Sequence, residues 1–143
     1  MKVKKSILTL REFWVVESNL VSVLPVKENQ LFEDISLDID FDILEGEDNF
    51  KLILRIEGNK GKKKKIGYSF TIVSEGIFNF TKKIEEKETN SMLLFSALPM
   101  MIANVRGYLA NISAYAPFGK YLLPSIDMKD LIENKQKMVS RFP

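Results

Sequence analysis

Hydrophobic and polar residues alternate along the first half of the chain, and this alternation predicts β-strands. The clearest segment is DISLDIDFDIL (34–44), in which every second residue is apolar and aspartates fill most of the positions between. FKLILRIE (50–57) and IGYSFTIVSEGIF (66–78) repeat the pattern. A period of two places one face of a strand in a core and the other in water.

A fourth segment, SILTLREFWVVESNLVSV (6–23), is also rich in strand-forming residues. Its alternation slips near Phe13 and Trp14, where we expect a bulge or a bend. The sequence therefore predicts an α+β fold whose first part is a four-stranded antiparallel meander, over about residues 6–80, with one face in water.

After residue 80 the apolar positions recur every three or four residues, which predicts a long helix over about 90–115. The residues of this stripe are Leu94, Leu98, Met101, Val105, Tyr108, Ile112 and Tyr115. Thr89 to Ser91 offer N-caps. Pro99 interrupts the stripe, so we expect a kink or a break there.

Small residues form a second stripe on nearly the opposite face of this helix. They are Ala103, Gly107, Ala110 and Ala114. A helix that is apolar on two faces is buried on both, and one sheet can cover only one of them. We therefore predict an oligomer whose interface includes Phe70, Ile72, Ala103, Gly107 and Ala110.

The segment SAYAPFGKYLLPSID (113–127) is unusually apolar for a loop, although its two prolines and its glycine argue against regular structure. Two interpretations are open: the loop packs onto its own sheet as part of the core, or it lines a binding surface. Asp127 is expected to cap a short amphipathic helix over about 128–140.

Composition narrows the possible functions. The 143 residues are 45% hydrophobic and 28% charged, with a net charge of +2, which fits a single domain over 1–143. Without cysteine or histidine, the chain has no thiol or imidazole for catalysis or metal binding. No apolar run approaches the roughly 18 residues of a membrane span, and no signal peptide is evident. We expect a cytoplasmic protein without a metal, a cofactor or membrane insertion.

Charge is distributed unevenly along the chain. The charged residues from Glu28 to Asp48 are all acidic, whereas KGKKKK (60–65) is basic. A basic cluster can bind nucleic acid, but this one lies between two strands, which favours a solvated hairpin tip. The aspartates Asp38, Asp40 and Asp42 project from the wet sheet face, where Lys51 and Arg55 could pair with them across the strands. They form either an ordinary charged surface or a docking surface for a basic partner. As carboxylates they are also the only plentiful acid–base candidates for an enzyme, and a solvated surface explains them better.

The order of these elements resembles the SecB family of protein-export chaperones. EGIFNF (75–80) resembles the end of that family's fourth strand, LPMMIANVRGYLANI (98–112) resembles its long helix, with Arg106 at the family's arginine, and APFGKYLLPSIDMKDLI (116–132) resembles its crossover loop and second helix. The resemblance covers about residues 26–132.

This resemblance implies a homotetramer, a dimer of dimers, that holds unfolded or precursor polypeptides without ATP. It implies a hydrophobic client groove that includes Phe118, Tyr121, Leu123 and Ile126. It also implies docking of the SecA motor on the wet sheet face, through Asp38, Asp40, Asp42 and position 71. Thr71 stands where the family has an acidic residue, so the resemblance supports chaperone activity more strongly than binding to SecA. The alternative is a SecB-like chaperone dedicated to one partner, such as an antitoxin or a phage protein.

Overall fold

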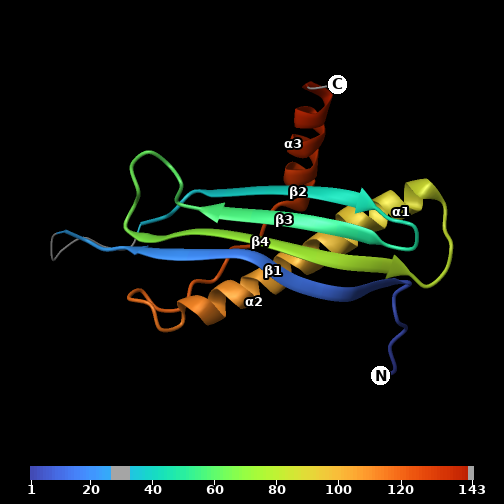
Figure 1. Cartoon of the computed structure of the whole chain (residues 1–143), viewed down its shortest axis with the longest axis horizontal. Coiled ribbons are helices and arrows are strands. Elements are labelled where there is room, and N and C mark those ends of the chain that lie inside the picture. Colours follow the sequence, from blue (N-terminus) through green and yellow to red (C-terminus); the bar gives the residue numbers. More distant parts are fainter. Residues whose placement is uncertain (27–32, 142–143) are drawn as a thin grey trace.

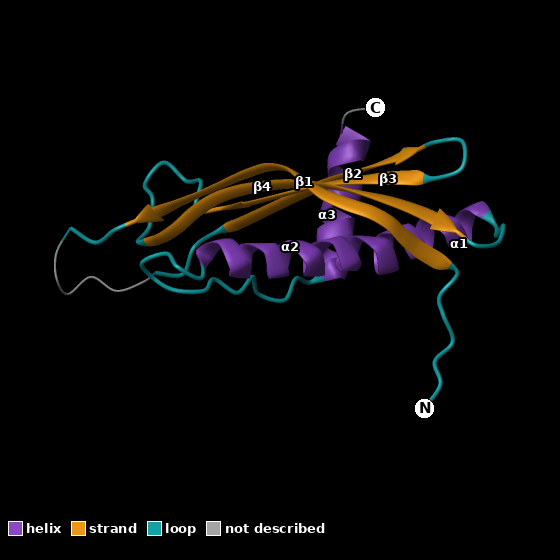
Figure 2. Ribbon diagram, turned by 60° about the horizontal axis from the view of Figure 1, so that its bottom comes forward, coloured by secondary structure: helices purple, strands orange, loops and turns teal. Residues whose placement is uncertain are grey.

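The computed structural model describes residues 1–26 and 33–141, and it consists of a sheet with helices across one face (Figures 1 and 2). The strands are β1 (Leu8–Val23), β2 (Leu37–Glu45), β3 (Phe50–Gly58) and β4 (Gly67–Phe80). The helical segments are α1 (Glu86–Met92), η1 (Leu93–Ala97), α2 (Leu98–Ser113) and α3 (Met128–Arg141). The antiparallel four-stranded sheet followed by helices confirms the predicted fold class.

The strand order differs from that of a continuous meander. β2, β3 and β4 follow one another, but β1 pairs with β4, which gives the order β1-β4-β3-β2. Strand length explains why β1 pairs with β4 and not with β2. β1 has 16 residues and β4 has 14, whereas β2 and β3 have 9 each. β4 can therefore pair with more of β1 than β2 can. The connection over 24–36 is also too long to impose a tight β1–β2 hairpin.

Two irregularities in β1 confirm the expected bulge. The register with β4 shifts between Leu10 and Glu12 and again between Val15 and Glu17, on either side of Phe13 and Trp14. Each shift adds one unpaired residue, which bends the strand and returns the following apolar side chains to the inner face.

The lysine-rich segment forms the tip of the β3–β4 hairpin, as predicted, with Lys60 to Lys65 exposed. Asn59 organises this tip in a left-handed conformation, with φ of 57°. Its side-chain amide donates to the Lys65 carbonyl at 2.8 Å and accepts from the Lys65 N–H at 2.9 Å.

The core lies between the sheet and α2. It contains the inward side chains of β3 and β4 together with the inner face of the helix; Leu52, Leu54, Ile56, Phe70, Ile72, Phe78, Leu98, Met101, Val105 and Leu109 are fully buried. Gly76 allows α2 to approach β4 closely, because a Cβ atom at this position would overlap the Met101 sulfur.

The helical stretch from Glu86 to Ser113 is continuous but changes type. The π-helical turn η1 ends directly before α2, with Pro99 in the first turn of α2. A π-turn accommodates the missing proline N–H, so the irregularity next to Pro99 is a change of helix type and the helix does not break there. The start is earlier than predicted: Glu85 is the N-cap position, and the Thr89 hydroxyl donates to its carbonyl from within the helix.

By length and composition, Glu86–Ser113 could also cross a membrane, which the sequence pattern had not indicated. In this chain its inner face belongs to the core.

Helix α3 begins where Asp127 caps it: the Asp130 N–H donates to the Asp127 carboxylate at 3.0 Å. The helix stands across the β2 edge of the sheet (Figures 1 and 2). Its first turns contribute Ile132 to the core.

Candidate functional site

The crossover loop over 114–127 joins the end of α2 to α3 and is fastened to β4 by Tyr68. The Tyr68 hydroxyl donates to the Gly119 carbonyl at 2.6 Å and accepts from the Phe118 N–H at 3.0 Å. Gly119 has a φ of 74°, a backbone conformation that residues with a side chain rarely adopt. One buried tyrosine therefore fixes the turn of the loop.

Helix α2 supplies two further anchors. The Arg106 guanidinium donates to the Leu123 carbonyl at 2.8 Å and to the Pro124 carbonyl at 3.3 Å. The Ser113 hydroxyl donates to the Leu109 carbonyl at 2.6 Å and accepts from the Tyr121 N–H at 2.8 Å. These bonds satisfy loop backbone groups that a helix or strand would otherwise satisfy, so the loop has a defined path although it lacks regular structure.

Aromatic rings form the inner wall of the site. The Tyr68 ring centroid lies 5.6 Å from that of Phe118 and 6.3 Å from that of Tyr121, and Tyr121 lies 5.3 Å from Phe70. Burial, with a smaller contribution from the negative charge of Asp34, raises the pKa of Tyr121 above 10. Tyr121 therefore remains a neutral, largely apolar group at physiological pH.

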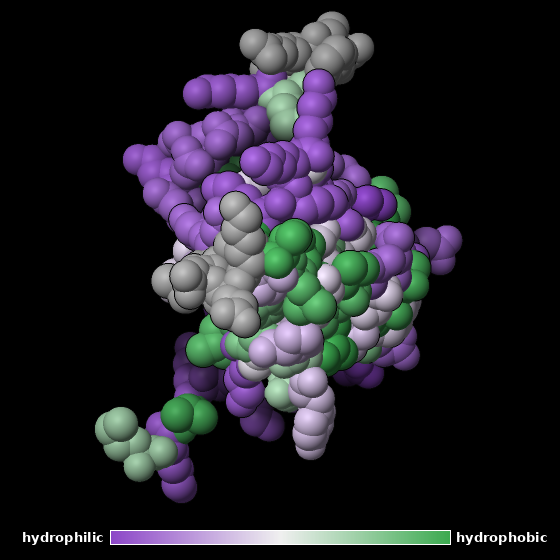
Figure 3. Space-filling model, turned by 90° about the vertical axis from the view of Figure 1, so that its left-hand side faces the viewer, coloured by the Kyte–Doolittle hydropathy of each residue, from purple (hydrophilic) through white to green (hydrophobic). Residues whose placement is uncertain are grey.

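These rings border a shallow pocket of about 320 Å³ lined by Tyr68, Phe118, Lys120, Tyr121 and Leu122. Leu122 is 65% exposed at its rim, and the whole side chain of Tyr115 lies in solvent. Just beyond the end of β1, Leu24 and Val26 are exposed too. Figure 3 shows hydrophobic side chains gathered in the middle of this end of the molecule, with hydrophilic ones above them. We call this region the loop-end surface: the pocket together with Tyr115, Leu24 and Val26.

The four residues predicted for the groove occupy different environments. Phe118 and Tyr121 line the pocket. Ile126 is partly buried against the core, and Leu123 is only 3% exposed, so it supports the loop from below. One side of the loop therefore packs on the core and the other side faces outward, and binding by the outward side stays a prediction.

Sequence reasoning missed Tyr68, Lys120 and Leu122 as residues of this site. The alternation over 66–78 puts Tyr68 on the same face of its strand as Phe70, and both side chains are buried. A signal was available, because a buried tyrosine hydroxyl needs a hydrogen-bond partner and the loop carries unpaired backbone groups.

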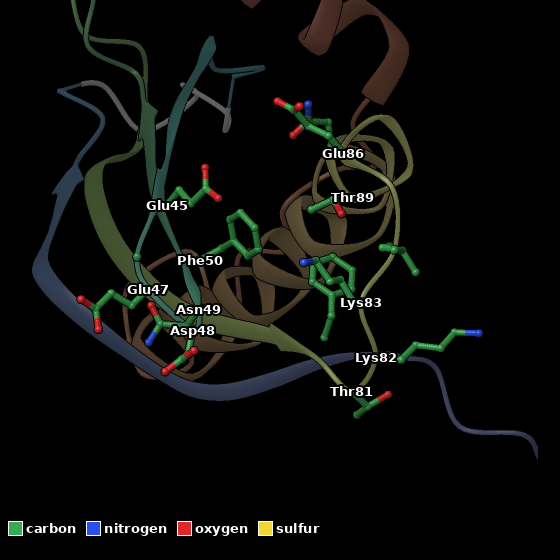
Figure 4. Close-up of a pocket in the computed structure, with 14 residues that line it drawn as sticks. Glu45, Glu47, Asp48, Asn49, Phe50, Thr81, Lys82, Lys83, Glu86 and Thr89 are labelled. Carbon is green, nitrogen blue, oxygen red and sulfur yellow. The ribbon is translucent and has the colours of Figure 1, made fainter.

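A second and larger cleft, of about 860 Å³, lies at the opposite end of the molecule (Figure 4). The β2–β3 turn and the segment between β4 and α1 form its walls. Phe50 and Phe80 meet edge to face at 5.8 Å on its inner side. Its rim is polar and carries charges of both signs, including Glu45, Glu86 and Lys83. This mixed rim contrasts with the apolar loop-end surface. Among residues 1–26 and 33–141, no cluster of three or more carboxylates suits a metal ion.

Comparison with known proteins shows which known fold this chain has. No protein-family model matches the chain, and no curated protein matches it in sequence. A solved structure of the Mycobacterium tuberculosis Rv1957 SecB-like chaperone, in complex with a ChAD peptide from the Rv1956 HigA1 antitoxin, matches with a TM-score of 0.58. The match covers 83% of this chain and 90% of that one, at 9% identity. The fold is SecB-like.

Within the SecB-like fold, the residues predicted for an oligomer interface separate into two groups. Phe70 and Ile72 are fully buried in the core of this one chain, beneath α2. Ala103 and Gly107 are exposed and Ala110 is half-buried, and nothing lies within 4 Å of a Cβ atom built on Gly107. We call the small residues Ala103, Gly107 and Ala110 the outer stripe of α2.

The residues predicted for partner docking on the SecB-like sheet are also divided. Asp38, Asp40 and Asp42 are exposed on β2, but Lys135 of α3 bonds Asp40 at 2.7 Å and Asp42 at 3.4 Å. Thr71 is only 8% exposed.

The expected cross-strand ion pairs with these aspartates are replaced by others. Lys51 pairs with Glu75 at 3.2 Å, and Arg55 pairs with Glu57 at 3.1 Å. Glu75 also accepts a bond from the Trp14 indole at 3.0 Å. The lysine and arginine of β3 thus pair with glutamates of β3 and β4, whereas Asp40 and Asp42 of β2 pair with Lys135 of α3.

Proposed function

We propose that this chain is a chaperone that binds unfolded polypeptide on the loop-end surface without a nucleotide. The observation that carries the proposal is a loop that exposes apolar side chains while its backbone is held by Tyr68, Arg106 and Ser113. A surface that must offer apolar groups to many sequences has to stay open without collapsing, and these anchors hold it open.

The chemistry of the surface suits a polypeptide more than a small molecule. The pocket is shallow, and exposed aliphatic and aromatic residues continue beyond it toward the end of β1. Burial of apolar side chains is non-directional, so such a surface can accept different sequences. The SecB-like fold supports this proposal, since the matching structure binds a peptide of another protein.

Two classes of client fit the proposal: precursor polypeptides destined for export, and one dedicated partner such as an antitoxin or a phage protein. The antitoxin peptide in the matching structure favours the second class. The sheet surface also favours a dedicated partner. Thr71 is buried and Asp40 is already paired with Lys135, so less acidic surface is left for a basic SecA segment. Export with SecA remains the other candidate.

We further propose that the chain assembles as a cytoplasmic homotetramer through the outer stripe of α2. Met100 and Phe95 lie exposed on the same helical stretch and enlarge its apolar surface. Small residues on a helix permit close backbone approach, and a second sheet layer or helix would remove this surface from water.

The direct test measures how well the protein suppresses aggregation of a chemically unfolded test enzyme, with no nucleotide present. Leu122→Asp places a charge on the loop-end surface at a well-exposed position, so the fold should be unaffected. We expect suppression to fall several-fold. The matched control is Leu44→Asp, also at an exposed leucine but on β2, which should behave as the wild type. Equal activity of all three proteins would contradict the assignment of the site.

Coupling to SecA is tested separately, by titrating a basic SecA tail peptide at low and at physiological salt. We expect weak binding that decreases with salt, because exposed charges are screened within about 10 Å at 0.1 M ionic strength. Tight binding that salt does not change would show that the acidic face is not the contact.

A further inference from the structure

β2 is the last strand of the sheet, and one of its sides has no strand partner among residues 1–26 and 33–141. The Asn59 N–H donates to the Ser36 carbonyl, and the Gly46 N–H donates to the Asn49 carbonyl. Because bonded and non-bonded pairs alternate in an antiparallel ladder, the even-numbered residues of β2 bond to β3. The backbone groups of Ile39, Phe41 and Ile43 therefore point to the free edge.

One of these edge groups is already capped. The Phe41 N–H donates to Oδ1 of Asp40 at 2.9 Å. Lys135 Nζ donates to the same oxygen at 2.7 Å, reaches Asp42 at 3.4 Å and lies 5.6 Å from the centre of the Phe41 ring. A lysine of α3, a carboxylate of β2 and an edge N–H thus form one continuous chain of hydrogen bonds.

Lys135 ties helix α3 to β2 at this point. Ile132, one turn before Lys135, is buried in the core, whereas Met138, one turn after it, is exposed. Figure 1 shows the rest of the helix projecting past β2. The Lys135 side chain is 20% exposed, and ion pairs that solvent can reach contribute little to stability. Such a contact can hold the helix in place and still be exchanged for another.

We propose that Lys135 and Asp40 form a displaceable lock on the β2 edge. Its competitor is an extended polypeptide segment that carries a lysine or arginine and adds to β2 as a fifth strand. This inference rests on the proposed function, since it assigns a second contact to the same class of client.

Charge complementarity identifies the competitor. Asp40 and Asp42 lie two residues apart on one strand, so a basic side chain from an added strand can take the place of the Lys135 ammonium between them. The N–H and C=O groups of Ile39, Phe41 and Ile43 would bond to the main chain of that segment, which is recognition by strand addition. The lock also protects the edge: while α3 stands across β2, unwanted strands are excluded.

Two variants test the lock without any client. Lys135→Gln removes the ammonium, and Lys129→Gln removes the same charge from an exposed position on the same helix. Hydrogen exchange of the Ile39, Phe41 and Ile43 amides is then compared. We expect exchange to be at least fivefold faster in Lys135→Gln, with Lys129→Gln like the wild type. Unchanged exchange in Lys135→Gln would overturn the lock.

The competitor is tested with two capped ten-residue peptides of alternating valine and threonine, one with two central lysines and one with two glutamates. Lys135→Gln should bind the lysine peptide at least fivefold more tightly than the wild type does and gain nothing for the glutamate peptide. Asp40→Ala should remove the preference for lysine. The assignment to a basic segment would be overturned by equal gains for both peptides, by no gain for either, or by self-association of Lys135→Gln beyond that of the wild type in light scattering. Because these variants leave the loop-end surface intact, failure here is separate from failure of Leu122→Asp in the aggregation assay.

Discussion

At the scale of single residues, Tyr68 connects the core to the loop-end surface. Its ring is buried, and its hydroxyl bonds two backbone groups of the loop. Tyr68→Phe removes that hydroxyl and leaves the Gly119 carbonyl and the Phe118 N–H without this partner. We predict a loss of about 1–3 kcal/mol in the free energy of unfolding, measured by urea denaturation.

Tyr115→Phe is the matched control for this change. The Tyr115 side chain lies in solvent, so its loss should stay within about 0.5 kcal/mol. Equal effects of the two substitutions would show that the Tyr68 bonds do not hold the loop.

Tyr121 gives a prediction about pH. Burial raises its pKa above 10 in the folded chain, with a smaller contribution from Asp34. A raised pKa means that the stabilising effect is fully present below pH 10 and is lost as the pH rises through the folded value. The pKa of Lys135 is also raised: burial lowers it, but bonds and attraction to Asp40 and Asp42 outweigh that effect. Stability should therefore fall above about pH 10 from both groups.

Absorbance of tyrosinate near 295 nm isolates the Tyr121 contribution. Tyr121→Phe should lose a tyrosinate step that the wild type shows above pH 10, and Asp34→Asn should shift that step to lower pH. A titration curve in which Tyr121→Phe loses an early step instead would contradict the burial of this hydroxyl.

Residue-scale features were only partly accessible from the sequence. The apolar composition of 113–127 showed that this segment is unusual for a loop, but Phe118 and Tyr121 were assigned to a groove only through the resemblance to the SecB family. The same composition could not tell Leu122 from Leu123, since adjacent leucines in an irregular loop have no period that assigns them to a face. The partner of Asp40 was also out of reach: Lys135 lies 95 residues away, and only the position of α3 brings it near.

At the scale of elements, α2 has one face in the core and one face with small residues exposed. The heptad-like spacing predicted both faces, and the structure places Ala103 and Gly107 outside. The period of two likewise predicted which segments form strands. The order of the strands was not, because the alternation in β1 shows which face is buried but not which neighbour supplies the hydrogen bonds.

Gly107→Leu tests the role of the outer stripe of α2. Space around this position in the single chain is open, so the fold itself should tolerate the side chain. In an assembly that packs against the stripe, overpacking costs about 1–3 kcal/mol, or roughly a 5- to 150-fold weaker association. Sedimentation or light scattering over a concentration series measures this.

Gln136→Leu on α3 adds a similar side chain at an exposed position away from the stripe and should leave association unchanged. A wild-type protein that is monomeric at micromolar concentration would refute the tetramer outright.

At the scale of the whole molecule, the two ends of the sheet offer different surfaces. The loop end is apolar and anchored, whereas the opposite cleft has a polar rim with charges of both signs. The two edges also differ: α3 stands across β2, while β1 lies at the other edge with bulges in its register. We propose that an unfolded chain contacts the loop end first and the β2 edge second.

Hydrogen exchange of the wild-type protein, with and without a permanently unfolded client, tests the central claim most directly. A reduced and carboxymethylated protein serves as the client, and no nucleotide is added. We predict that the client slows exchange across 114–127 and at the end of β1, while the cleft segments at 45–50 and 80–90 are unchanged. Protection confined to that opposite cleft, or no protection with the client bound, would contradict the account.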